Sequence, residues 1–129
     1  MNNLNFSFDH SILTKTDSYK VSHWKGYIDG LEKNVSYLEA RSPSDFSDET
    51  IFFGLQYLIK RHLVGQVVSR FDLPKMAAFC KNHFMGREDI FNLQGWEYII
   101  EKYNGYLPIK IRSVPEGTPV KVQNVLMTI

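Results

Sequence analysis

The hydrophobic pattern of the chain changes its period at Asn104-Gly105, and this change limits the possible folds more than any other feature. Before it, apart from one strand pattern at Lys33–Arg41, apolar residues recur at the spacing of amphipathic helices. After it, apolar and polar residues alternate along Leu107–Val114, which is the period of a strand. Helical and strand patterns that are largely separated along one chain are typical of the α+β class. We therefore predict an α+β fold.

Four segments carry a helical pattern or helix-capping residues: Thr16–Trp24, Glu49–Leu63, Asp72–Gly86 and Leu93–Tyr103. Thr16 or Asp17 can cap the first of these. The Glu49–Leu63 segment has the most regular apolar spacing and is predicted as the strongest helix. Pro74 suits the first turn of the third helix, where a missing N–H costs little. Asn92 is expected to cap the fourth helix, and Asn104-Gly105 to end it.

Alternating, β-branched or aromatic residues predict strands over Lys33–Arg41, Leu107–Val114, Val120–Val122 and Val125–Ile129. The segments between them have turn chemistry. These are the loop Ser42–Asp48, the turn Pro115–Pro119 and the turn Gln123-Asn124. The chain stops within an apolar run, so we expect a truncated domain that continues in, or pairs with, another polypeptide.

Composition excludes several classes of protein. With 129 residues the chain allows one domain, expected over residues 11–129 behind a flexible arm of residues 1–10. A net charge of +1 argues against a nucleic-acid-binding module. The single cysteine, Cys80, excludes an internal disulfide and is expected to be a buried apolar residue. No signal peptide or membrane span is visible, which favours a cytoplasmic protein.

The segment Thr16–Trp24 is the best candidate for a binding site. It holds a carboxylate, hydroxyls, a phenol, an ammonium, an imidazole and an indole within one short stretch. Such a mixture suits a surface that holds a flat, polar ligand. Ser18 beside Asp17 is better explained as a helix cap than as a catalytic pair. The histidines are scattered without the spacing of a helical zinc site, so we expect no metal ligands among them.

Arg41 is the second candidate, because it ends a predicted strand and enters a polar loop. A guanidinium in that position can clamp a phosphate through paired hydrogen bonds. The alternative is an ordinary surface arginine. The chain has neither a dinucleotide-binding glycine motif nor a P-loop.

The chain resembles the N-terminal part of the nicotinamide phosphoribosyltransferase family, collinearly over about residues 11–129. The resemblance rests on Thr16–Val21 with His23, Glu39–Arg41, Phe53–Leu58, Gly95-Trp96 with Tyr98-Ile99, Tyr103–Ile109, Val114–Gly117 and Asn124–Leu126. It implies the N-terminal domain of a type II phosphoribosyltransferase-like fold. In that domain helices pack on a mainly antiparallel sheet, and a large α/β barrel follows it.

The resemblance also implies an activity. Family members make nicotinamide mononucleotide and pyrophosphate from nicotinamide and phosphoribosyl pyrophosphate, with Mg²⁺ and coupled ATP hydrolysis, as homodimers. By this resemblance Tyr19 would stack on the nicotinamide ring from the partner subunit, with Asp17 beside it. Arg41 would hold a phosphate of the sugar donor. From the residues themselves, we expect Lys20, His23 and Trp24 to hold the short helix in place.

The remaining site residues of the family lie in the barrel, beyond this chain. We therefore expect that the chain binds neither Mg²⁺ nor ATP alone and is inactive alone, working as a homodimer or with a C-terminal fragment. Two alternatives stay open: a non-catalytic binding module derived from this domain, and a relative that uses nicotinate.

Overall fold

The computed structural model describes residues 11–129 and divides into two compact units. The helical unit comprises residues 11–29 and 60–108, and the strand unit comprises residues 30–59 and 109–129. Helices and antiparallel sheets are both present, so the predicted α+β class is confirmed. The predicted arm of residues 1–10 lies outside the described residues.

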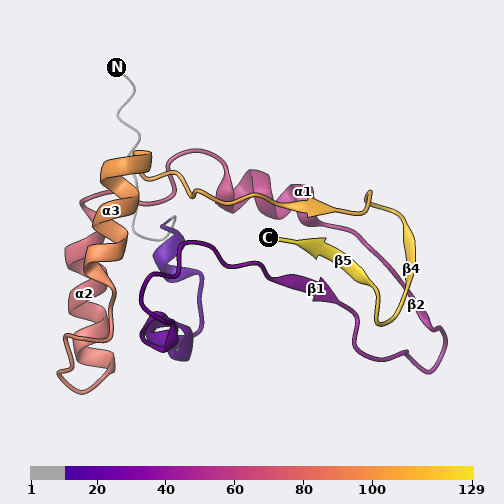
Figure 1. Cartoon of the computed structure of the whole chain (residues 1–129), viewed down its shortest axis with the longest axis horizontal. Helices are drawn as coiled ribbons and strands as arrows, with labels where there is room; N and C mark the ends of the chain where they lie inside the picture. The colour runs from indigo at the N-terminus through magenta and orange to yellow at the C-terminus, as the bar shows by residue number, and fades with distance from the viewer. Residues whose placement is uncertain (1–10) are drawn as a thin grey trace. The chain divides into compact units, whose positions relative to one another are not determined.

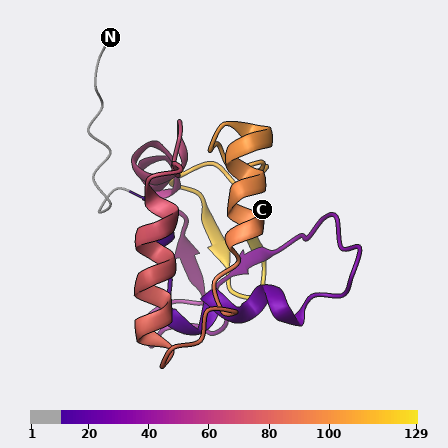
Figure 2. The ribbon, with the colours of Figure 1, turned by 90° about the vertical axis from the view of Figure 1, so that its left-hand side faces the viewer.

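The helical unit is built on two α-helices, α2 (Asp72–His83) and α3 (Leu93–Tyr103), which lie side by side (Figures 1 and 2). Two 3₁₀ helices precede them, η2 (Ile12–Thr14) and η3 (Ser18–Gly26). The buried core consists of Leu13, Val68, Leu73, Met76, Cys80 and Phe91. Trp96, Ile99 and Ile100 of α3 are partly buried and pack against it. Within residues 11–129, no helix is long and apolar enough to cross a membrane.

Local hydrogen bonds fix the start of α2 and both ends of α3. Asp72 is 1% exposed, and its carboxylate accepts hydrogen bonds from the backbone N–H and the hydroxyl of Ser69, each at 2.8 Å. The Asn92 side chain accepts from the Gly95 N–H at 2.9 Å, and Asn104 ends α3 in the left-handed conformation. The predicted bounds of α3 are therefore confirmed. Cys80 is buried, as predicted, and burial raises the pKa of its thiol.

Val67 and Val68 join the parts of the helical unit through the backbone. The Val67 carbonyl accepts from Ile12 N–H at 3.0 Å, and the Val67 N–H donates to the Gly105 carbonyl at 3.0 Å. Val68 is fully buried in the core. Gly105 approaches so closely that an added Cβ would lie 2.2 Å from the Val68 carbonyl oxygen. We refer to the contacts of Val67 and Val68 with Ile12 and Gly105 as the backbone crossing. A residue with a side chain cannot occupy position 105 without moving this crossing.

The strand unit contains two antiparallel sheets. Strands β1 (Tyr37–Glu39), β5 (Val125–Thr128) and β3 (Arg112–Ser113) form the first, in the order β1-β5-β3 (Figure 1). Strands β2 (Glu49–Ile51) and β4 (Pro119–Lys121) form the second. The buried apolar side chains of this unit, as described, are Phe52 and Leu126.

The prediction of one helix over Glu49–Leu63 was wrong at its start. Glu49–Ile51 is strand β2, and helix α1 (Leu55–Leu58) begins only after Gly54, whose φ is 96°. The helical path then continues as the π-helix η4 (Ile59–Leu63). Pairing with β4 holds the first residues extended, and the Glu116 carboxylate accepts from the Gln56 N–H at 2.7 Å, which caps α1. Strand pairing with a distant segment therefore outweighs the helical apolar spacing at Glu49–Ile51.

The predicted strands Lys33–Arg41 and Leu107–Val114 were too long. The structure keeps only Tyr37–Glu39 and Arg112–Ser113, because both strands pair with β5 and its length limits them. The predicted strands near 120–122 and 125–129 are confirmed as β4 and β5, within one or two residues at each end. The loop Ser42–Asp48 and the turns at Pro115–Pro119 and Gln123-Asn124 are confirmed as well.

Replacing Gly105 by alanine should destabilise the chain far more than replacing Gly86. Both glycines have positive φ, +76° and +87°, but an added Cβ meets nothing within 4 Å at Gly86. We expect Gly86→Ala to lower the free energy of unfolding by about 1–2 kcal/mol through backbone strain alone. Gly105→Ala adds overpacking and should cost roughly 3 kcal/mol or more in urea unfolding. Equal losses for the two variants would show that the crossing is not tightly packed.

Candidate functional site

Tyr19 lies in the first turn of η3 and presents its ring to solvent, with 59% of the residue exposed. The ring packs against His23, one turn later, with 5.3 Å between centroids and 57° between planes. The Lys20 ammonium lies 5.9 Å from the ring centroid. The phenol therefore has neighbours within its own helix, and its exposed part remains accessible to a flat ligand.

Asp17 stands at the N-cap of η3, as predicted, but its side chain makes no capping hydrogen bond. Its backbone carbonyl accepts from Lys20 N–H at 3.0 Å. Its carboxylate lies 3.8 Å from the Lys20 ammonium, at the surface. Lys20 thus contacts both Asp17 and Tyr19, and the structure brings these two predicted site residues together. The Asp17 carboxylate keeps oxygen atoms that can accept a hydrogen bond from a ligand.

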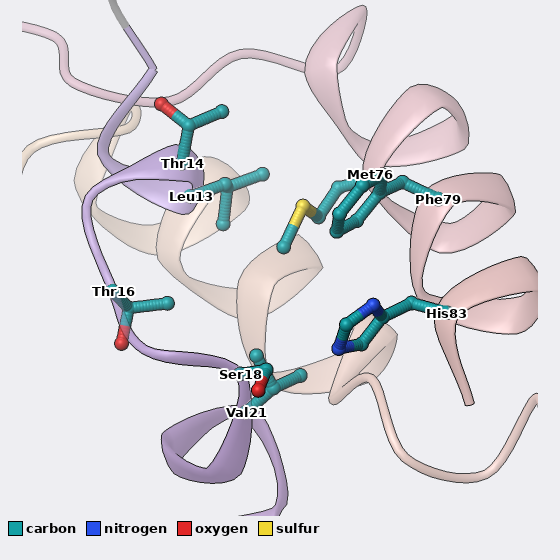
Figure 3. A pocket seen from close by; sticks show the side chains of 8 residues that line it. All are labelled: Leu13, Thr14, Thr16, Ser18, Val21, Met76, Phe79 and His83. Atoms are coloured by element: carbon teal, nitrogen blue, oxygen red, sulfur yellow. The ribbon is translucent and has the colours of Figure 1, made fainter.

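A cavity with a volume of about 320 Å³ opens between the η2–η3 segment and α2 (Figure 3). Its lining is mainly apolar, and comprises Leu13, Thr14, Thr16, Ser18, Val21, Met76, Phe79 and His83. Figure 3 shows the His83 ring directed towards Val21 and Ser18, and Met76 directed towards Leu13. His83 also stacks on Phe79, with 5.6 Å between centroids and 10° between planes. Tyr19 does not line this cavity.

Sequence reasoning missed this cavity. Three of its lining residues, Met76, Phe79 and His83, follow the i, i+3, i+7 pattern on one face of α2. That spacing was visible in the sequence, although it predicts only a shared helix face. The opposite wall comes from a segment distant in sequence, and no local pattern indicates such a pairing.

Arg41 belongs to the strand unit and is exposed. It follows Ala40, whose carbonyl accepts from the Gln123 N–H at 2.8 Å, while the Asp48 carbonyl accepts from Val122 N–H at 2.9 Å. Both ends of the Arg41–Ser47 loop are therefore fixed on adjacent residues of the β4–β5 turn. Within residues 11–129, no ion pair is formed by the Arg41 guanidinium, which leaves its donors for an anion.

The described residues do not group into a metal site. Across residues 11–129, no cluster of three or more His, Cys, Asp or Glu side chains could hold a metal ion. Residues 11–129 therefore offer no carboxylate set that fits Mg²⁺, and we assign no reaction step to a metal here.

Comparison with known proteins decides the family. A sequence profile described as the nicotinamide phosphoribosyltransferase N-terminal domain matches residues 11–111. The chain belongs to this family. One relative, named nicotinamide phosphoribosyltransferase, from Xanthomonas campestris pv. campestris, is 40% identical over 119 residues. Another of the same name, from Acinetobacter baylyi, is 31% identical over 133 residues.

The matches cover 92% and 95% of this chain but only 24% and 26% of the two relatives. The chain thus spans about a quarter of the length of the curated relatives it matches. The family match includes Asp17, Tyr19 and Arg41, which all lie within residues 11–111.

Asp89 should make a small contribution to the acid limb of the stability curve, because its ion pairs lie at the surface. Hydrogen bonds from Arg87 and then from Lys25 hold the pKa of Asp89 well below its usual range. Its contribution to stability is therefore present above the unfolded pKa of about 4 and is lost as the pH falls towards the folded pKa. Asp89→Asn should unfold at lower urea than wild type at pH 7, and the difference should shrink below about pH 4. A difference that stays constant down to pH 2 would contradict this assignment.

Proposed function

We propose that this chain forms the N-terminal domain, over residues 11–129, of an enzyme that converts nicotinamide and phosphoribosyl pyrophosphate to nicotinamide mononucleotide and pyrophosphate. The observation that carries the proposal is the exposed Tyr19 ring beside the uncapped Asp17 carboxylate, in a chain of this family. An aromatic face with an adjacent hydrogen-bond acceptor suits a flat pyridine amide.

Three residues take roles in this proposal. Tyr19 is contributed to the active site of the partner subunit in a homodimer, where it stacks on the nicotinamide ring. Asp17 lies beside the ring in the same site. Arg41 holds a phosphate of the sugar donor with paired hydrogen bonds, from a loop whose two ends are fixed.

The proposed reaction needs positioning more than covalent catalysis. The bond between sugar C1 and the pyrophosphate oxygen breaks, and the pyrophosphate leaves with the bonding electrons. The ring nitrogen of nicotinamide supplies the electron pair of the new bond to C1. Holding the ring in line and neutralising the phosphates lowers the barrier without a protein nucleophile.

The rest of the site lies outside this chain in our proposal. We infer a type II phosphoribosyltransferase arrangement in which an α/β barrel completes the ring sandwich and supplies the residues for Mg²⁺ and ATP. The coverage of only a quarter of the relatives supports this division. The chain then works as part of a homodimer, or together with a C-terminal fragment, and is inactive alone.

A second candidate is a binding module without catalysis. It is favoured by the core of the helical unit, which gives that unit apolar packing of its own. Such a module would be a stable, monodisperse species by size-exclusion chromatography at low concentration. Such a module would also give no catalytic turnover when it is joined to the barrel of a relative.

A chimera separates the two candidates. The matching N-terminal quarter of the Xanthomonas campestris relative is replaced by this chain, and nicotinamide mononucleotide is measured by chromatography. The proposed function predicts product from nicotinamide and phosphoribosyl pyrophosphate. A chimera that melts cooperatively, forms dimers and yields no product would overturn the enzyme proposal and favour the binding module.

Substitutions at Tyr19 should act on nicotinamide binding in this chimera. Tyr19→Ala removes the stacking surface and should raise KM for nicotinamide about tenfold or more, since aromatic stacking on a base contributes about 1–3 kcal/mol. Tyr19→Phe keeps the ring and should stay within about threefold of wild type, because a hydrogen bond at an exposed phenol contributes little. An equal rise in KM for nicotinamide in both variants would show that the hydroxyl, not the ring, contacts the ligand.

Arg41 should act on the sugar donor instead. Arg41→Lys keeps the charge but loses the planar pair of donors, so we expect KM for phosphoribosyl pyrophosphate to rise while KM for nicotinamide is unchanged. The matched control is Arg70→Lys, at an exposed arginine that pairs with Glu101 on α3. An equal rise in both variants would mean that Arg41 has no special contact with the donor.

A further inference from the structure

The helix η3 is long for its type and has little packing to hold it. It spans nine residues, whereas 3₁₀ segments beyond three or four residues are uncommon. None of its residues is buried. Most helices in proteins are stabilised by an apolar face against the core, and here only Val21 makes such contact. Another interaction must fix the helix that carries Tyr19.

That interaction comes from the segment of residues 84–92 that joins α2 to α3 (Figure 2). The Trp24 indole N–H donates to the Ile90 carbonyl at 2.8 Å. Lys25 forms an ion pair with Asp89, and the Arg87 guanidinium donates to both Asp89 oxygens, at 3.1 and 2.8 Å. We refer to these contacts of Trp24, Lys25, Arg87, Asp89 and Ile90 as the Asp89 clamp.

The joining segment is itself well fixed. Its start closes onto α2, with Gly86 N–H donating to the Lys81 carbonyl at 2.7 Å and Arg87 N–H to the Phe84 carbonyl at 3.2 Å. Near its end, Ile90 and Phe91 are buried, with 5% and 7% exposed. A contact made to this segment is therefore a contact to the core of the helical unit.

We propose that the Asp89 clamp is a positioning device, in which Trp24 and Asp89 set the orientation of η3 and thereby of the Tyr19 ring. Tyr19 and Trp24 lie at opposite ends of one short helix, so rotation at the Trp24 end moves the ring. The proposal rests on the proposed function for its significance, because it deepens the role of Tyr19. The Asp89 carboxylate pairs with the Lys25 ammonium of η3 and with the Arg87 guanidinium of the joining segment, and so links the two segments.

The two parts of the clamp differ in strength. The ion pair is at the surface, where such pairs contribute little. The Trp24 hydrogen bond is partly buried, and its loss leaves the carbonyl of a buried residue without a partner. Trp24→Phe should therefore loosen η3 more than Asp89→Asn.

Amide hydrogen exchange on the full chain, without substrate, tests the proposal. The Lys20 and Tyr27 N–H groups, which donate to the Asp17 and Trp24 carbonyls, report on η3. They should exchange about five- to tenfold faster in Trp24→Phe and about two- to threefold faster in Asp89→Asn. In Asp89→Glu, which keeps a carboxylate, these two amides should exchange at close to the wild-type rate. The contact between the Tyr19 and His23 rings, followed by nuclear Overhauser effects, should weaken in parallel.

Glu88→Gln is the matched control, since it makes the same charge change one residue earlier and removes only the pair with Lys81 on α2. It should leave η3 unchanged, and amides inside α3 should be unchanged in all variants. Equal acceleration in Glu88→Gln, or an equal rise in α3, would reveal general destabilisation and overturn the proposal.

In the chimera, Asp89→Asn should raise KM for nicotinamide two- to threefold and leave kcat unchanged. Faster exchange with an unchanged KM would overturn the positioning of Tyr19. A wild-type chimera that makes no product would overturn the proposed function alone, because the exchange and ring contacts are measured on this chain without substrate.

Discussion

The backbone crossing at Val67-Val68 is the contact on which the helical unit depends. Val67 donates to Gly105 and accepts from Ile12, so one residue joins the first helix, the entry to α2 and the end of α3. Val68 is fully buried beside them. These hydrogen bonds place Leu13 against α2 and so bring the Ser11–Trp24 segment to the surface of the core. The crossing fixes the segment that leads into η3, and the Asp89 clamp fixes the other end of that helix.

The two units are stabilised by different interactions. The helical unit buries a contiguous apolar cluster, while the strand unit relies on backbone pairing and on Phe52 and Leu126. The candidate site residues are divided in the same way. Tyr19 and Asp17 stand on the unit with the larger core, and Arg41 stands in a loop whose two ends are fixed by hydrogen bonds to one turn. Both a stacking contact and a paired phosphate contact gain from a fixed support, because small misplacements of a binding group are costly.

Local signals explain what the sequence could predict. The bounds of α3 follow from Asn92 and Asn104, which act within a few residues. The composition of Thr16–Trp24 indicated a candidate binding segment, and the family resemblance singled out Tyr19 and Asp17 within it. Glu49–Ile51 was assigned to a helix because its pairing partner, Pro119–Lys121, lies far along the chain. The contact of Lys25 with Asp89 spans 64 residues and has no local signature. The cavity beside α2 was missed for the same reason, since its two walls come from separate segments.

Native-state hydrogen exchange at the crossing tests this account most directly. If the Val67 crossing organises the helical unit, the amides of Ile12 and Val67 should be among the slowest to exchange in the full chain. The amides of β1, in the unit with few buried side chains, should exchange at least about tenfold faster. Protection of Val67 that is no greater than that of Leu38 in β1 would contradict the account, because η3 would then lack the rigid support that we assign to it.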